Sequence, residues 1–237
     1  MQLVGAATDG LTLAQISREI GAPRSSLHVL LKTLTEMRFL EYAPDGRYRL
    51  GLAAFEVGAS YLASVTPVRV ARPELAALSR DLLVTAHFAV LDNGSALYLD
   101  KSEPENLAVR LVSAVGARLP AQFTSVGKAC LAYATEDALS SLDFQVVDSM
   151  GCVVDAVALQ EELKLVRSQG YAVDEGRTTI GVNCVAAPVF DANRRCQGAV
   201  GVSYVSRGGP MLKTCATAVA MAAGRISTRL GFREISA

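Results

Sequence analysis

Polar and basic side chains gather between residues 24 and 49 in a pattern that suits contact with nucleic acid. In the first part of this segment, apolar residues recur at helical spacing and predict one buried stripe made of Leu27, Leu30, Leu31 and Leu34. Outside that stripe stand the groups that could donate hydrogen bonds to base edges and phosphates: Arg24, Ser25, Ser26, His28 and Lys32, followed by Arg47 and Arg49.

The elements that must position these side chains form a predicted winged helix-turn-helix. Thr12 and Gln15 have the spacing of a capping box, and Gly21 suits the left-handed turn that ends a short helix. Pro23 suits the first turn of the second helix, because its missing N–H has no partner there. Runs 39–42 and 47–50, joined by a Pro-Asp-Gly turn, predict a hairpin. The second helix would then face the major groove, with the hairpin arginines near the phosphates.

Other interpretations of this segment remain open. Lys32 and Arg38 could equally be solvated charges on a helix or DNA contacts. His28 alone could be an ordinary surface histidine. The whole segment could be a small helical subdomain that binds another protein. The helix spacing and the hairpin agree in order and length, which favours the winged helix-turn-helix.

Charge and composition exclude several classes of protein. The 237 residues hold 23 Lys+Arg and 23 Asp+Glu, so DNA binding cannot rest on bulk charge. Five cysteines form no Cys-x-x-Cys pair and there are two histidines, which predicts no metal and no cofactor. The longest uncharged run, residues 178–190, has 13 residues. A membrane span needs about 18 apolar residues. Because the N-terminus also lacks a signal-peptide pattern, we expect a cytoplasmic protein with no membrane partner.

The rest of the chain predicts an α+β domain. Apolar runs 84–91 and 96–100 flank Asp92-Asn93-Gly94-Ser95, a strong hairpin signal, and 107–115 alternates like a third strand. Strands are also expected at 182–190 and 199–205, and helices at 74–82, 126–134, 159–169 and 212–230. Strands that pair through turns, with helices on their faces, make an antiparallel sheet flanked by helices. The expected domains are 1–52, a linker helix and linker over 53–73, and 74–237.

Catalytic signals are weak in this second domain. The motifs GxSxG, HExxH and the P-loop are absent from the sequence. Asp174 and Glu175 could do acid–base chemistry and Cys184 could act as a nucleophile, but neighbours on a strand point to opposite faces. The one histidine of this domain, His87, lies in the first hairpin. We therefore expect a ligand sensor and no enzyme. The alternative is a cytosolic metabolite-binding enzyme with an accessory helical domain.

Three long segments resemble bacterial transcription regulators of the isocitrate-lyase-regulator (IclR) type. Residues 11–52 are similar to the winged helix-turn-helix of that family, and residues 116–133 and 170–206 to two blocks of its effector domain. The resemblance implies a GAF-like effector domain, a homodimer or homotetramer, and binding of double-stranded operator DNA that a small organic acid or aromatic metabolite alters. Family members have a full first helix before the position of Leu11, so we expect the first helix here to be truncated.

The resemblance also implies an effector pocket. Its wall would match Ala108, Leu111 and Leu119, its backbone contacts Ser125 and Val126, and its strand positions Asp174, Cys184, Gly201 and Ser203. Gly201 stands where the family often has serine, which removes a hydroxyl donor and predicts room for a larger ligand. The alternative for Cys184 and Ser203 is that both are buried strand residues with no ligand.

Overall fold

The computed structural model describes residues 1–104, 114–205 and 211–233. The chain divides into two compact units, residues 1–65 and 66–237. The division falls within the segment 53–73 that the sequence assigns to the linker.

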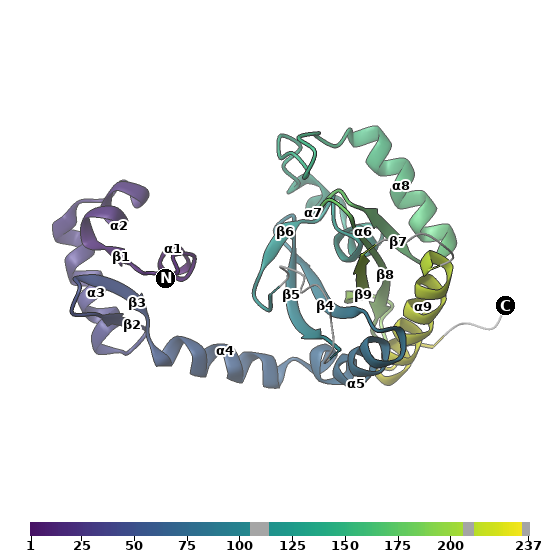
Figure 1. The fold of residues 1–237 in the computed structure, drawn as a ribbon, viewed down its shortest axis with the longest axis horizontal. Helices are drawn as coiled ribbons and strands as arrows, with labels where there is room; N and C mark the ends of the chain where they lie inside the picture. The colour runs from purple at the N-terminus through teal and green to yellow at the C-terminus, as the bar shows by residue number, and fades with distance from the viewer. Residues whose placement is uncertain (105–113, 206–210, 234–237) are drawn as a thin grey trace. The chain divides into compact units, whose positions relative to one another are not determined.

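The first unit is a winged helix-turn-helix (Figure 1). Its elements are α1 (Gln2–Gly5), β1 (Leu11–Thr12), α2 (Leu13–Ile20), α3 (Arg24–Glu36), β2 (Leu40–Tyr42), β3 (Arg47–Leu50) and α4 (Leu52–Ser64). The antiparallel strands lie in the order β1-β3-β2. A small core joins the helices to the sheet and consists of Val4, Ile16, Leu27, Leu31, Leu40 and Tyr48.

Local signals at the ends of α2 are confirmed. The Thr12 hydroxyl accepts from the Gln15 N–H, the Gln15 side chain accepts from the Thr12 N–H, and Gly21 has a φ of 70°. The predicted place of Pro23 is wrong by one position. It caps α3 from outside the helix with a ψ of 139°, so the helix begins at Arg24.

The predicted apolar stripe of the second helix is partly wrong. Leu27 and Leu31 are buried, but Leu30 is 53% exposed. The core of this unit is small, so it covers only a narrow strip of each helix. Strand β1 was also not predicted, because its partner Tyr48 is far away in the sequence.

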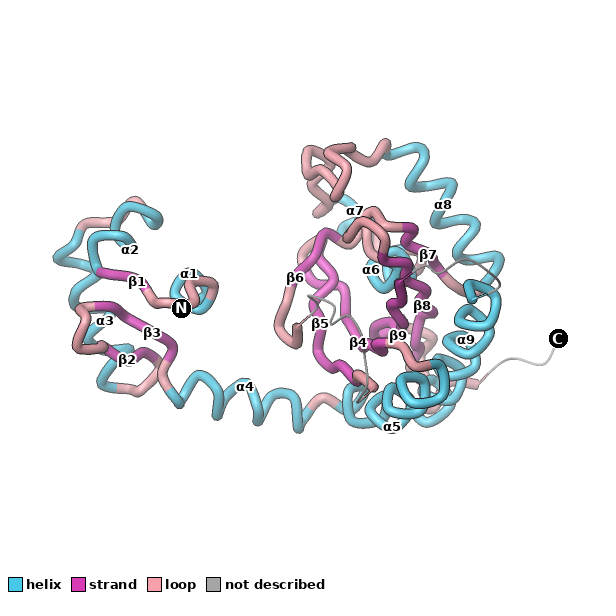
Figure 2. Tube along the Cα trace, viewed as in Figure 1, coloured by secondary structure: helices cyan, strands magenta, loops and turns pink. Residues whose placement is uncertain are grey.

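The second unit is built on a six-stranded antiparallel sheet with the strand order β6-β5-β4-β9-β8-β7 (Figure 2). The strands are β4 (Thr85–Asp92), β5 (Ser95–Ser102), β6 (Arg118–Pro120), β7 (Ala172–Glu175), β8 (Val182–Phe190) and β9 (Cys196–Val205). The helices are α5 (Thr66–Leu82), α6 (Ser125–Leu131), α7 (Glu136–Ser140), α8 (Ala156–Gln169) and α9 (Met211–Arg229). The expected antiparallel sheet flanked by helices is confirmed.

Helices cover both faces of this sheet. Helices α5 and α9 pack on each other and on one face, and α6 packs on the other face with α8 outside it. Along β9, Ala199 belongs to the core on the α6 side, whereas the neighbouring Val200 points to the opposite face. Every second residue of the central strands therefore faces α6.

One sequence expectation in this unit is wrong, and another concerns residues that the structure mostly does not describe. The sequence predicts a helix from residue 74, but α5 is continuous from Thr66 to Leu82 with Pro73 inside it. Val68, Ala71 and Leu75 are buried along one side of this helix. Their packing offsets the loss of the backbone hydrogen bond that Pro73 cannot donate. Most of the predicted strand 107–115 lies outside the described residues, and the described strand that pairs with the outer side of β5 is β6.

Candidate DNA-binding face and effector site

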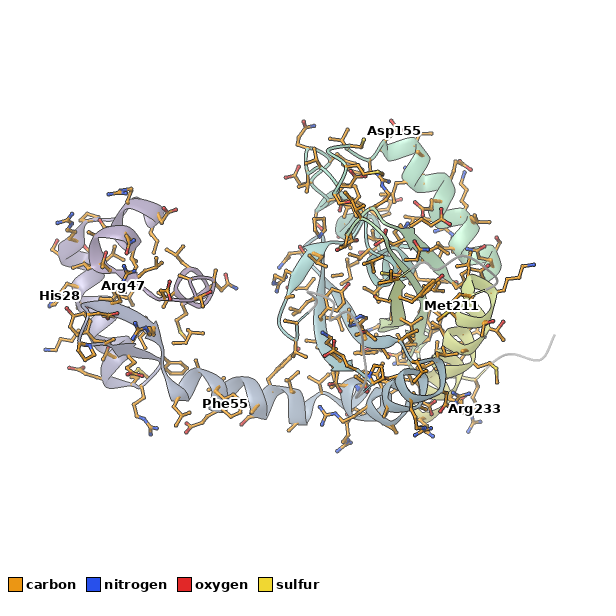
Figure 3. The ribbon with its side chains drawn as sticks, viewed as in Figure 1. His28, Arg47, Phe55, Asp155, Met211 and Arg233 are labelled. Atoms are coloured by element: carbon orange, nitrogen blue, oxygen red, sulfur yellow. The ribbon has the colours of Figure 1, made fainter. Side chains whose placement is uncertain are left out.

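Helix α3 presents the predicted DNA-contacting side chains on its outer surface. Leu27 and Leu31 are each 4% exposed and hold the opposite side of the helix against the core. The exposed residues include all five that the sequence singled out: Arg24, Ser25, Ser26, His28 and Lys32. Figure 3 shows the His28 side chain at the outer edge of the unit. This face is therefore available to a partner.

The two wing arginines already make contacts within the unit. The Arg47 guanidinium donates to the Gly10 carbonyl oxygen at 3.0 Å. Arg49 pairs with Asp45 at 2.6 Å and donates to the Asp9 carbonyl oxygen at 3.4 Å. A guanidinium carries five N–H donors, so each arginine can tie the wing to the loop before β1 and still offer donors to a phosphate.

Val29 belongs to the same outer face but was missed from the sequence. It is 66% exposed and lies one turn from Ser25 and about one turn from Lys32. An apolar side chain in the major groove can contact the methyl group of thymine. Its position among apolar neighbours hid it, and only the orientation of α3 shows that it faces outward.

A row of polar side chains crosses the sheet of the second unit beneath α6. We call it the polar belt: Thr85 and His87 on β4, Ser203 on β9, Cys184 on β8 and Asp174 on β7. Strand register places Thr85 opposite Ser203, Ser203 opposite Cys184, and Cys184 opposite Asp174. His87 Nε2 lies 3.2 Å from Ser203 Oγ, and Cys184 Sγ lies 3.1 Å from the same oxygen.

Both ends of the polar belt contain buried polar atoms without a hydrogen-bond partner. They are Thr85 Oγ1 and His87 Nδ1 at one end and Asp174 Oδ2 at the other. Thr85, His87 and Asp174 are at most 3% exposed. Leaving such a group unpaired costs about 1–3 kcal/mol, so these atoms mark the belt as a candidate ligand site.

Burial controls the protonation of the belt. It lowers the pKa of His87 to about 3, helped by the charge of Lys101, so the imidazole is neutral at pH 7. Burial and the charge of Asp174 raise the pKa of Cys184 to about 12, so it is a thiol and a poor nucleophile. Burial also raises the pKa of Asp174, against the opposing effects of Thr178, the Arg177 N–H and Lys128.

Helix α6 lies directly over this part of the sheet. Its first residues, Ser125 and Val126, are buried, and a Cβ on Gly201 would stand 3.0 Å from Val126 Cγ1 and 2.9 Å from Ala186 Cβ. The sequence suggested that Gly201 makes room for a larger ligand, and this prediction is wrong. Gly201 allows α6 to approach β9 closely.

Lys128 on α6 is a buried cation at the edge of the belt. Its side chain is 2% exposed, and its ammonium pairs with Glu162 on α8. The charge of Lys128 also acts on Asp174 and Cys184. The pair therefore joins α6 to α8 and sets the electrostatic potential near the Asp174 end of the belt.

A second ion pair holds the loop that follows Asp174. Arg177 Nε donates to Asp148 Oδ2 at 2.8 Å, and its guanidinium lies 5.0 Å from the centre of the Phe123 ring. The Arg177 N–H also donates to Asp174 Oδ1 at 2.8 Å. This loop positions the carboxylate of Asp174.

The structure brings together most of the predicted pocket residues that it describes. Val126, Asp174, Cys184, Gly201 and Ser203 lie on or against the belt. Leu119 is half-buried on β6 and packs on the same core. Ala108 and Leu111 lie outside the described residues.

The sequence reasoning missed Thr85, His87 and Thr178 as parts of this site. A histidine and a threonine two residues apart on one strand was the available signal, since such residues share a face. Among the described residues there is no group of three or more His, Cys, Asp or Glu that could hold a metal ion.

The fold and these two sites define the class of protein: a DNA-binding transcriptional regulator that carries a separate effector domain. A family model for the IclR helix-turn-helix domain matches residues 1–44, and one for the bacterial transcriptional regulator IclR C-terminal domain matches residues 59–227. The chain belongs to the IclR family of bacterial transcriptional regulators, and it is therefore a regulator and not an enzyme.

Named relatives agree over most of the chain. The regulator XynR of Escherichia coli K12 is 34% identical over 83% of this chain and 79% of its own length. The crystal structure of Thermotoga maritima IclR has a TM-score of 0.71 at 25% identity, covering 94% of this chain and 92% of that one. An IclR homologue from Microbacterium hydrocarbonoxydans, solved with 4-hydroxybenzoate, shares the fold. Its TM-score is 0.78 at 23% identity, over 92% of this chain and 90% of its own. No helix among the described residues is long and apolar enough to span a bilayer.

Proposed function

We propose that this regulator binds operator DNA through α3 and changes its affinity when a small organic acid or aromatic metabolite occupies the polar belt. The observation that carries the proposal is the set of unpaired buried atoms at Thr85, His87 and Asp174. A ligand that binds one arrangement of the protein better than another shifts the equilibrium between them. We place the protein in the cytoplasm, where it can reach the chromosome.

For DNA contact, α3 enters the major groove and the wing lies along the backbone. The residues we assign to base edges and nearby phosphates are Arg24, Ser25, Ser26, His28 and Lys32, and those we assign to phosphates are Arg47 and Arg49. Their exposure on α3 and the spare donors of the wing arginines support this assignment.

The proposed DNA-binding form is a homodimer, or a homotetramer made of dimers. Helix α4 has no buried residue, and its Leu52, Phe55, Val57 and Tyr61 side chains are 56–71% exposed. Figure 3 labels Phe55 on this helix. Large apolar side chains that follow one helix mark an interaction surface, and we assign it to a second copy of the chain. Two paired α3 helices would read half-sites about 34 Å apart, one turn of DNA.

The residues we assign to the effector are those of the belt and its surroundings. Asp174, Cys184 and Ser203 supply polar atoms, while Ser125, Val126 and Gly201 line the approach of α6 to the sheet. Leu119 forms part of the apolar wall, and Ala108 and Leu111 stay in the proposal on the sequence resemblance alone.

Retardation of operator DNA, taken from the region beside the gene, tests the DNA face. Arg24→Ala and Lys32→Ala should each weaken binding about 5- to 150-fold, because one good contact is worth about 1–3 kcal/mol. Loss of a phosphate contact should also reduce the salt slope by about 0.9. Lys164→Ala, on the exposed side of α8, is the control. Unchanged affinity and slope in both variants would remove α3 from the DNA interface.

A thermal-shift screen of small carboxylic acids and aromatics tests the effector site. A ligand that binds only the folded protein raises the melting temperature, by mass action. Calorimetry with any compound found should show weaker binding to Asp174→Ala and Ser203→Ala. Wild-type affinity in both variants would place the ligand elsewhere.

A further inference from the structure

Val29 lies at the centre of the outer face of α3 and is the most exposed large apolar side chain of that helix. Its exposed fraction is 66%, whereas Leu27 and Leu31 on the buried side are each 4% exposed. Successive residues turn by about 100° around an α-helix, so Val29 is about 160–200° away from both leucines. The side chain therefore points directly away from the core of the first unit.

The surroundings of Val29 on this face are polar. The exposed residues three or four positions away from it are Ser25, Ser26, Lys32 and Thr33. Lys32 pairs with Glu36 at 3.8 Å. The Thr33 hydroxyl donates to the Val29 carbonyl oxygen at 3.1 Å, so it is turned back onto the helix. Val29 thus interrupts a polar surface with a side chain that can neither donate nor accept a hydrogen bond.

Glu36 limits the part of α3 that can lie close to DNA. Its side chain is 63% exposed, and a carboxylate repels phosphates. Recognition helices of this motif contact bases through their N-terminal residues. Val29 is the sixth of the 13 residues of α3, and it lies on the N-terminal side of both Lys32 and Glu36. It is therefore placed where the helix would face the base edges.

Thymine offers the one group in the major groove that suits an apolar side chain. Guanine, adenine and cytosine present hydrogen-bonding nitrogen and oxygen atoms there, whereas thymine also presents its C5 methyl group. A valine over a polar edge would remove water from that edge without replacing its hydrogen bond. A valine over the methyl group removes two apolar surfaces from water, which is favourable.

We propose that Val29 selects thymine in the operator by packing on its C5 methyl group, and this assignment rests on the proposed function above. Each half-site then carries a T·A pair at the position that Val29 faces. Cytosine at this position lacks the methyl group and presents an N–H donor that valine cannot pair. The basic neighbours on α3 supply affinity for phosphates, whereas Val29 supplies a choice of base.

Deoxyuridine tests this proposal directly, because it differs from thymidine by the absence of the C5 methyl group. Duplexes that the full chain binds are first selected from a random-sequence library by DNA retardation. Each thymine of one half-site in the tightest duplex is then replaced in turn by deoxyuridine. We expect binding to weaken about fourfold for at least one position, the factor that burial of one methyl-sized group supplies. Full affinity at every replaced position would overturn the proposal.

Val29→Ser shows whether this residue contacts the methyl group. Valine and serine have similar helix propensities and the position is exposed, so the melting temperature should not change. In this variant thymine and deoxyuridine should bind equally at a position that is sensitive in the wild type. Val29→Ile stays apolar and should keep the difference between the two bases.

Ile20→Ser is the matched control, since Ile20 is β-branched and 56% exposed but lies on α2. It should keep the wild-type difference between thymine and deoxyuridine. If Val29→Ser also keeps that difference at every sensitive position, another residue contacts the methyl group and the proposal is wrong. Loss of the difference in Ile20→Ser would equally contradict a specific role of Val29.

The selection step tests the proposed function separately. A full chain that enriches no duplex would count against DNA binding through α3, and so against the proposed function itself. A chain that binds the selected duplexes but tolerates every deoxyuridine would leave DNA binding intact and refute the role of Val29 alone.

Discussion

Removing the Glu162 carboxylate should destabilise the second unit more than removing the Lys128 ammonium, although both changes break the same ion pair. The reason is unequal burial. The Lys128 side chain is 2% exposed, whereas that of Glu162 is 34% exposed. After Glu162→Gln the ammonium stays buried without its partner, but after Lys128→Met the carboxylate can turn to water.

The burial of each side chain sets the expected magnitudes. Leaving a charge buried without its partner costs about 3–5 kcal/mol. The attraction of Asp174 for Lys128 keeps the cost of Glu162→Gln near the lower end of this range. Lys128→Met should cost about 1 kcal/mol, as for a partly exposed pair, because Asp174 keeps the hydrogen bond from the Arg177 N–H. In a unit of this size 1 kcal/mol moves the melting temperature by about 2–4 °C, so we expect falls of about 6–12 °C and 2–4 °C.

Differential scanning calorimetry of the full chain measures both changes. Glu161→Gln is the matched control, because Glu161 is on the same helix but pairs with Lys164 at 2.7 Å in an exposed position. That pair should contribute less than about 1 kcal/mol. The double variant Lys128→Met with Glu162→Gln should recover much of the loss. A larger effect of Lys128→Met, or equal effects of Glu161→Gln and Glu162→Gln, would refute the reasoning from burial.

Two further predictions concern His87 in the belt and Gly201 beside it. As the pH falls from 6 to 3.5, the free energy of unfolding of the wild type should decrease faster than that of His87→Phe, by about 1.4 kcal/mol per pH unit. The reason is that the histidine takes up a proton in the unfolded chain, whereas the buried ring, with a pKa of about 3, does not. Parallel urea midpoints against pH would contradict this prediction. Gly201→Ser should lower the free energy of unfolding by about 1–3 kcal/mol, measured by thermal unfolding, because the new Cβ meets Ala186 and Val126. Adding Val126→Ala to this variant should recover part of the loss. A neutral Gly201→Ser would show that α6 shifts freely.

Elements set by neighbours in the chain could be predicted from the sequence. The Thr12–Gln15 capping box involves residues three apart, and the turn at Asn93-Gly94 has the positive φ values of 48° and 73° that its hairpin type requires. Such interactions depend on local backbone geometry, so residue type and spacing are sufficient to find them. The capping box and the hairpin are both confirmed.

Elements set by distant partners could not be predicted in this way. Strand β1 exists because Leu11 pairs with Tyr48, and α5 continues through Pro73 because its buried side packs on the sheet and on α9. Leu30 fits the helical period of a core position, yet it faces outward. In each case the deciding interaction joins segments that the sequence alone does not place together.

The sequence by itself determined the family, the winged helix-turn-helix and the α+β effector domain, because cap, turn and periodicity signals are local and accumulate over long segments. The tertiary structure decided which polar atoms meet. His87 and Ser203 are 116 positions apart, and only the register of β4 on β9 brings them within 3.2 Å. Burial then decides which of these atoms lack partners. The chemistry of the effector site therefore follows from long-range strand pairing and burial, which residue spacing does not encode.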